Sequence, residues 1–180
     1  IEFDLADAKD INKLPTKGVE GVILLAALLP ANSSVDLDKD ENAADYFKIN
    51  TIGTINILEY CRKNNIKKFI SCSSYADVFN AWKKGYAIKE TEPRNYNYKG
   101  DHAVYVFSKN AAEDMIHYYN EQHGLQGAMF RFPPVYGVGP HGSIYVNGKV
   151  YKSGIQTFIE KAEKGENIEI WGNPNITRDI

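Results

Sequence analysis

Tyr105 and Lys109 form the residue pair with the clearest chemical potential in this sequence. They stand four positions apart at the start of a predicted helix, so the phenol and the ammonium share one helix face. A phenol titrates near 10 and is a poor base at neutral pH. A neighbouring cation favours the phenolate and so lowers the pKa of the phenol. The pair can therefore serve as a general acid/base, although the same spacing also occurs on ordinary solvated helix faces.

Hydroxyl and amide side chains accompany this pair. Ser74 closes the run Ser71-Cys72-Ser73-Ser74 at the end of a predicted strand that precedes Tyr105. A hydroxyl in this position can bond a substrate oxygen beside the tyrosine, but serines also commonly end strands and begin turns. Asn50 lies within an earlier predicted helix, where it either bonds the backbone across the sheet or is simply exposed.

The elements that must position these residues alternate regularly along the chain. Three strands are predicted over Val22–Ala27, 67–73 and Gln126–Phe132, helices over 43–64, 105–123 and 155–164, and a last strand over 168–171. The apolar run of the first strand is typical of a strand buried on both faces. This alternation predicts a parallel α/β sheet. Because such sheets bind ligands at the carboxyl ends of their strands, the residues just past each strand are the candidate site.

Size and composition exclude several classes of protein. The chain has 180 residues, 43% of them hydrophobic, and carries 21 Lys+Arg against 23 Asp+Glu, a net charge of −2. These are globular proportions, and the near-neutral charge argues against a nucleic-acid partner. The longest apolar stretch, 21–31, is shorter than the roughly 20 residues of a membrane span. Cys61 and Cys72 form no CxxC pair, which favours free thiols and a cytoplasmic location.

Two further patterns carry no site. Gly137-Val-Gly-Pro-His-Gly142 is a literal G-x-G-x-x-G, but Pro140 and the turn-forming residues after it do not open a helix. We therefore expect a loop near the substrate rather than a phosphate cradle. The four histidines have no metal-ligand spacing, so no metal site is predicted.

An ordered series of short motifs spans nearly the whole chain. In chain order these are Asp4-Leu5, Leu25-Ala26-Ala27, Asn50-x-x-Gly53-Thr54-x-Asn56-x-Leu58, Lys68-Phe69-Ile70-x-x-Ser73-Ser74, Tyr105-x-x-x-Lys109, Arg131-Phe132-Pro133-Pro134-Val135-Tyr136-Gly137, and Trp171-Gly172 with Arg178-Asp179. The series resembles the extended short-chain dehydrogenase/reductases of the NAD-dependent epimerase/dehydratase family, the group that includes UDP-galactose 4-epimerase.

The resemblance implies a Rossmann-type parallel sheet with helices on both faces. It implies that the first βαβ unit and the carboxyl-terminal substrate part lie outside this chain. Residues 1–136 would be a partial NAD(P)-binding Rossmann domain, and residues 137–180 the start of a substrate-binding region.

The resemblance also implies roles for individual residues. Tyr105 would be the acid/base, Lys109 would hold the nicotinamide ribose hydroxyls, and Ser74 would be their hydroxyl partner, with Ser73 as the alternative. The cofactor-binding set would be Asp4, Leu5, Leu25, Ala26, Ala27, Asn50, Cys72, Tyr105, Lys109, Phe132 and Pro133. The substrate would meet Ser74, Tyr75 and Arg178.

The implied function is an NAD(P)-dependent epimerase or dehydratase that acts on a nucleotide sugar through Tyr-assisted hydride transfer. The cofactor would be NAD, and NADP stays open because the acidic residue that reads the adenine ribose would precede Asp4. A homodimer formed through the two long helices is also implied. Two departures from the family are Pro134, where many members carry Asn, and Leu24, where many carry His. The alternative function is a non-catalytic NAD(P)-binding regulatory or interaction protein of the same fold.

Overall fold

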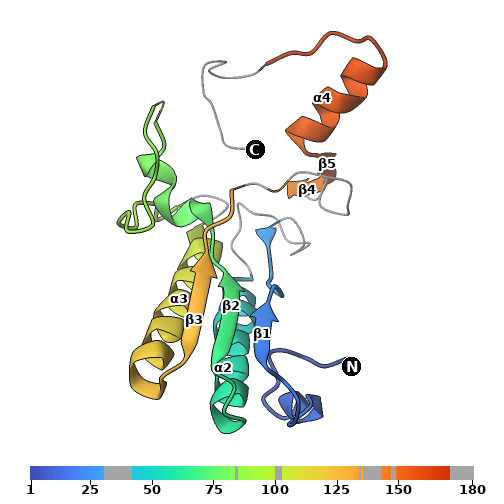
Figure 1. The fold of residues 1–180 in the computed structure, drawn as a ribbon. Coiled ribbons are helices and arrows are strands. Elements are labelled where there is room, and N and C mark those ends of the chain that lie inside the picture. Colours follow the sequence, from blue (N-terminus) through green and yellow to red (C-terminus); the bar gives the residue numbers. More distant parts are fainter. Residues whose placement is uncertain are drawn as a thin grey trace.

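A three-stranded parallel sheet forms the centre of the chain. The computed structural model describes residues 1–30, 42–83, 85–99, 103–133, 135, 143–146 and 149–170. The strands are β1 (Gly21–Leu24), β2 (Lys68–Cys72) and β3 (Gln126–Phe130), hydrogen-bonded in the order β1-β2-β3. The register pairs Ile23 with Ile70, and Ile70 with Ala128. All three carboxyl ends therefore reach one edge of the sheet, as the alternation predicts (Figure 1).

Two long helical segments join the strands. The first runs through α1 (Ala43–Tyr46), a π-helical stretch η3 (Phe47–Ile52) and α2 (Gly53–Lys63), and the second is α3 (Ala103–His123). Gly124 follows α3 with φ of 63°, the left-handed conformation that glycine adopts without strain at a helix end. Both segments agree with the helices predicted from the sequence, apart from the π-helical interruption.

The helices α2 and α3 pack against each other and cover the same face of the sheet (Figure 1). Consecutive parallel strands joined by right-handed crossovers require this placement. Within the described ranges no helix covers the opposite face, so the described residues do not supply the expected second helical layer. The parallel Rossmann-like arrangement itself is confirmed.

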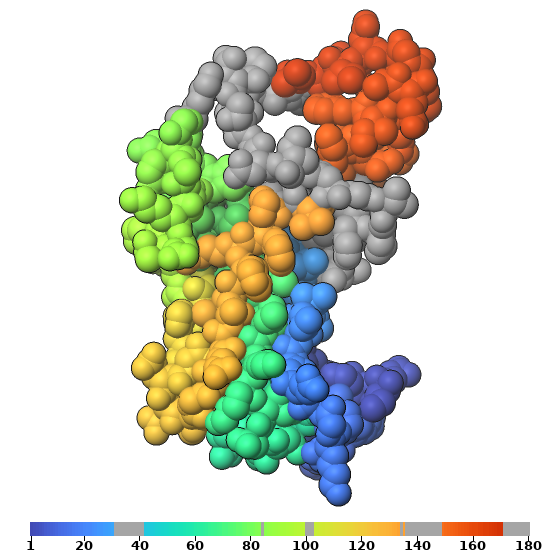
Figure 2. Space-filling view, in the orientation of Figure 1, coloured from blue at the N-terminus to red at the C-terminus, as the bar shows by residue number. Residues whose placement is uncertain are grey.

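The hydrophobic core lies between the sheet and this single helical layer. Its fully buried members include Leu58 and Cys61 of α2, Phe69 of β2 and Ile116 of α3. Side chains of the opposite sheet face are open to solvent: Ile23 is 67% exposed and Phe130 is 47% exposed. Figure 2 shows all three strands at the surface on this face. The sheet is thus buried on one side only.

Apart from a 3₁₀ turn, η1 (Asp10–Lys13), which precedes β1, the remaining elements lie beyond the carboxyl ends of the strands (Figure 1). A 3₁₀ turn, η4 (Tyr75–Ala81), follows β2 directly. Further along, β4 (Ser143–Val146) pairs antiparallel with β5 (Lys149–Lys152) and leads into α4 (Gly154–Glu163). None of the described helices is both long and apolar enough to cross a membrane.

Three strand predictions need correction. β1 ends at Leu24 rather than at Ala27, and β3 ends at Phe130 rather than at Phe132, so the last residues of both predicted strands belong to the following loops. No strand forms over 168–170, the described part of the predicted last strand; Ile168 and Ile170 are exposed there and pair with no other strand. An alternation of two apolar residues is too short a pattern to specify a strand without a partner.

Candidate active site

Tyr105 and Lys109 lie one turn apart on α3, close to the carboxyl edge of the sheet. Both side chains are buried, with only 9% of Tyr105 and 8% of Lys109 exposed. The ring of Tyr46 meets the Tyr105 ring edge-on, with 6.3 Å between centroids. The phenol therefore stands in a largely apolar setting at the end of the strands.

Ser73 and Ser74 have different partners, although they are neighbours in sequence. Ser74 is the N-cap of η4, where its Oγ accepts a hydrogen bond of 3.2 Å from the backbone N–H of Ala76. Its side chain also interacts with the Tyr105 phenol. The Ser73 hydroxyl instead donates to Glu113 Oε2 at 2.7 Å. The geometry thus favours Ser74 over Ser73 as the hydroxyl beside the tyrosine.

Burial decides the pKa of Tyr105. Desolvation raises the pKa of the phenol above its usual value, and hydrogen bonding with Ser74 opposes this rise only in part. The nearby groups Cys72, Tyr46 and Tyr75 raise the pKa further. The sequence-based expectation of a lowered pKa is therefore wrong for the chain as it stands, because removal from water outweighs every favourable neighbour.

Burial shifts Lys109 toward its neutral form as well. Desolvation lowers the pKa of the ammonium, while Cys72 and Glu113 act to raise it. Among the described residues, the Lys109 ammonium has no hydrogen-bond or ion-pair partner. A buried cation of this kind can bind hydroxyl groups of a ligand that reaches the sheet edge.

Asn50 connects the loop after β1 to the helix that carries Tyr105. Its amide oxygen accepts from Leu28 N at 2.7 Å, and its Nδ2 donates to Leu28 O and to Ser108 Oγ, each at 3.0 Å. The Ser108 hydroxyl in turn donates to the Tyr105 carbonyl at 2.7 Å. Of the two alternatives open at the sequence level, the structure selects the buried, hydrogen-bonded one: Asn50 is 2% exposed.

The other residues predicted near a cofactor come from the ends of the three strands. Leu25 is 68% exposed just past β1, with Ala26 exposed and Ala27 half-buried beside it. Cys72 ends β2 and is half-buried. Phe132, which is 47% exposed, and Pro133, which is half-buried, follow β3.

The amino-terminal segment lies against the first turn of α2. The Leu5 side chain fills the space beside Gly53, where an added Cβ would come within 2.6 Å of Leu5 Cγ. Asn56 Nδ2 donates to Leu5 O at 3.0 Å, and Asp4 is exposed next to it. A glycine at position 53 is thus required for this close approach.

Of the predicted substrate residues, Tyr75 is half-buried, and its ring lies 5.2 Å from that of Trp82 between centroids. Arg178 lies outside the described residues. In the part of the chain that the structure describes, no group of three His, Cys, Asp or Glu side chains is placed to hold a metal ion.

A charged cluster next to Ser74 escaped the sequence analysis. Glu113, Asp77 and Arg131 come from α3, η4 and the end of β3, and they meet beside Ser73. Arg131 begins one of the sequence motifs quoted above, and Glu113 follows Lys109 by four positions and so continues the face of Tyr105 and Lys109. The pairing of the cluster depends on residues far apart in the chain.

Comparison with known proteins gives a consistent picture. The family model "Epimerase: NAD dependent epimerase/dehydratase family" matches residues 1–180. A putative UDP-glucose 4-epimerase of Methanocaldococcus jannaschii is 35% identical over 185 residues, which cover 99% of this chain and 54% of that protein.

Solved structures agree with this match. The UDP-glucose 4-epimerase of Thermotoga maritima, solved with UDP-glucose, superposes with a TM-score of 0.71 at 25% identity, covering 96% of this chain and 51% of that one. The UDP-glucose 4-epimerase of Brucella ovis in complex with NAD gives a TM-score of 0.61 at 25% identity, covering 82% of this chain and 42% of that one. The chain spans about half the length of the relatives it matches.

Proposed function

The chain belongs to the NAD-dependent epimerase/dehydratase family, and we propose that it carries the catalytic residues of an enzyme that converts nucleotide sugars. The observation that supports this proposal is the burial of Tyr105 and Lys109 one turn apart on α3, with Ser74 interacting with the Tyr105 phenol. The relatives named as UDP-glucose 4-epimerases support the substrate class.

The residues at this edge fit the ribose and nicotinamide end of NAD. Lys109 offers a buried ammonium that has no hydrogen-bond or ion-pair partner among the described residues, so it can bind the ribose hydroxyls. Leu25 and Ala26 offer an exposed apolar and small surface at the end of β1. When bound, NAD would supply reversible acceptance of a hydride from a sugar carbon. NADP is the alternative cofactor.

The chain's own residues would move the proton and hold the reactants. Tyr105 would take the proton of a sugar hydroxyl as its carbon is oxidised, and would return that proton in the reverse step. Ser74 would hydrogen-bond the same sugar oxygen. Lys109 would bind the ribose hydroxyls and, as a cation, would favour the phenolate against the effect of burial.

The wider features of the enzyme are proposals of the same kind. Residues 1–136 would form the cofactor-binding part and residues 137–180 would begin the substrate-binding part, where Arg178 would meet the substrate diphosphate. The assembly would be a homodimer. A cytoplasmic location agrees with the free thiols of Cys61 and Cys72.

Replacement of the tyrosine tests the catalytic proposal. In the full-length protein, Tyr105→Phe should lower kcat for nucleotide-sugar conversion by about 10²–10⁴-fold, because it removes the titrating hydroxyl and keeps the ring. The Kd of the cofactor, measured by the fluorescence of its reduced form, should stay within about twofold of the wild-type value. Tyr98→Phe, a change at an 82% exposed loop position, is the matched control.

The result separates the two candidate functions. Near-wild-type turnover in Tyr105→Phe would overturn the catalytic role. Cofactor binding without hydride exchange, across UDP-, GDP- and CDP-sugars, would instead support the non-catalytic regulatory or interaction protein.

A further inference from the structure

A buried set of charged side chains lies directly behind the Ser74 turn. We call Ser73, Asp77, Glu113 and Arg131 the Glu113 cluster. The Ser73 hydroxyl donates to Glu113 Oε2 at 2.7 Å. Arg131 Nη2 lies 3.7 Å from Glu113 Oε1, and Arg131 Nε lies 3.0 Å from Asp77 Oδ2. The cluster thus joins β2, η4, α3 and the end of β3 at one point.

The two carboxylates of this cluster are buried to an extent that is unusual for charged groups. Asp77 is 1% exposed and Glu113 is 8% exposed. Within the described residues, neither carboxylate oxygen of Asp77 has a hydrogen bond, so its pairing with Arg131 is an ion pair without ideal alignment. Burial raises the pKa of Asp77, and the positive charge of Arg131 opposes this rise only in part. Buried ion pairs contribute little net stability, which makes a positioning role the better account of this one.

The cluster holds the chain on both sides of Ser74. Ser73, immediately before it, is bound by Glu113. Asp77, three residues after it, is bound by Arg131, and its backbone N–H bonds the Ser74 carbonyl at 3.4 Å. Ser74 therefore sits in a turn whose two ends are fixed to α3 and to the end of β3.

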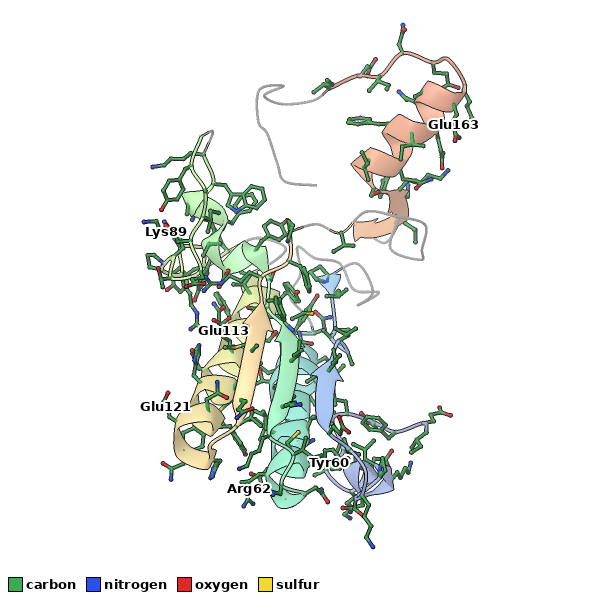
Figure 3. All side chains as sticks on the ribbon, viewed as in Figure 1. Tyr60, Arg62, Lys89, Glu113, Glu121 and Glu163 are labelled. Carbon is green, nitrogen blue, oxygen red and sulfur yellow. The ribbon has the colours of Figure 1, made fainter. Side chains whose placement is uncertain are left out.

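The anchor on α3 is continuous with the catalytic face. Tyr105, Lys109 and Glu113 follow one another at intervals of four positions, so they line one side of the helix. Glu113 projects from the middle of α3, beside the ends of β2 and β3 (Figure 3). The residue that holds the serine turn thus sits on the same rigid element as the tyrosine that the serine faces.

We propose that Glu113 and Arg131 are positioning residues that hold Ser74 at its place beside Tyr105. The catalytic meaning of this inference rests on the proposed function. The positioning itself does not, because it concerns the geometry of the turn. Glu113 also supports the positive charge of Lys109, since its carboxylate opposes the lowering of the Lys109 pKa by burial.

Two variants of the full-length protein test the inference. Ser73→Ala removes the hydroxyl bound by Glu113 and leaves every charge in place. Glu113→Gln keeps the shape and removes the charge. Amide hydrogen exchange, followed by mass spectrometry, should become at least about tenfold faster over residues 73–81 in both variants, because one end of the turn is released.

Kinetics give the second readout. In both variants kcat should fall by about 10- to 100-fold with KM within about threefold, as expected for a misplaced catalytic group. In Glu113→Gln alone, the alkaline limb of the kcat profile should move to lower pH. The carboxylate raises the pKa of Lys109, so without it the ammonium loses its proton at a lower pH. A merely structural defect would not shift that limb.

Glu121→Gln is the matched control. Glu121 lies on the same helix, two turns after Glu113, and its side chain is exposed (Figure 3). This variant should retain wild-type exchange over residues 73–81 and kcat within about twofold, since surface substitutions away from such clusters have small effects.

The outcomes separate this inference from the proposed function. Wild-type exchange rates over residues 73–81 in Ser73→Ala would overturn the positioning role, whatever the activity. The positioning role would also be overturned if the wild type is active and both Ser73→Ala and Glu113→Gln keep its full kcat. An inactive wild-type protein would overturn the proposed function, and the exchange rates would still decide whether the cluster holds the turn.

Discussion

At the scale of single residues, burial governs the chemistry of the candidate site. Tyr105 and Lys109 are both more than nine-tenths buried, and desolvation favours the neutral form of each. A raised pKa keeps the tyrosine protonated at neutral pH, so in this chain it stands ready as a proton donor. Only added positive charge, or a ligand that compensates the desolvation, would turn it into a base at the same pH.

The two cysteines offer a residue-scale test of the structure. Cys61 is fully buried, and burial raises its pKa to about 11, whereas Cys72 is half-buried at the end of β2. At pH 8, iodoacetamide should therefore alkylate Cys72 at least about 100-fold faster than Cys61, because only the thiolate reacts. Peptide mass spectrometry measures both rates in one sample, and unfolding in urea provides the control that equalises them. Equal rates in the folded protein would contradict the packing of Cys61 in the core.

At the scale of elements, the site depends on how α3 is held against the loop after β1. Asn50 supplies that connection, from a π-helical stretch where the backbone departs from the regular α-helix. Such irregular turns are often found at functional sites. Leu28 lies past the end of β1, and the Asn50 side chain supplies hydrogen bonds to its backbone N–H and carbonyl in place of a neighbouring strand.

Removal of this amide should weaken the fold measurably. Asn50→Ala leaves the Leu28 N–H and carbonyl without their side-chain partner and removes one of the two hydrogen bonds of the Ser108 hydroxyl, so the free energy of unfolding should fall by about 2–4 kcal/mol. Urea denaturation of the full-length protein measures this change. Asn80→Ala, which removes an exposed hydrogen bond to Asn97, is the control and should stay within about 0.5 kcal/mol of the wild type. Equal stability of the two variants would show that the Asn50 bonds are not needed.

At the scale of the whole molecule, the sheet is covered on one face only within the described residues. Ile23 of β1 and Phe130 of β3 are 67% and 47% exposed, and Leu25 and Phe132, just past these strands, are 68% and 47% exposed. The strands themselves are at the surface on this face (Figure 2). Exposed apolar patches are typical of faces that bind another surface.

The open face predicts how this 180-residue chain behaves when it is produced by itself. It should bind the dye ANS strongly, and Ile23→Lys combined with Phe130→Lys should lower the dye fluorescence at least about twofold, because both changes place charge on the apolar surface. Tyr98→Lys, at an exposed loop position, should leave the fluorescence unchanged. Weak dye binding by the unaltered chain would argue against an accessible apolar face.

Much of this arrangement follows from short-range pattern in the sequence. The alternation of strands and helices, the shared face of Tyr105 and Lys109, and the gathering of strand ends at one edge depend on periods of two to four residues and on chain direction. Such regularities are local, so the sequence by itself determines them. The same reasoning extended β1 too far and predicted a strand at 168–171, because a short apolar run does not reveal whether a partner strand is present.

Other properties of the site were decided by the tertiary structure alone. The different partners of Ser73 and Ser74, the raised pKa of Tyr105 and the Glu113 cluster all depend on which distant residues pack against each side chain. Ser73 and Glu113, for example, are 40 positions apart. Desolvation and charge pairing are set by the three-dimensional neighbourhood, and no period in the sequence encodes that neighbourhood.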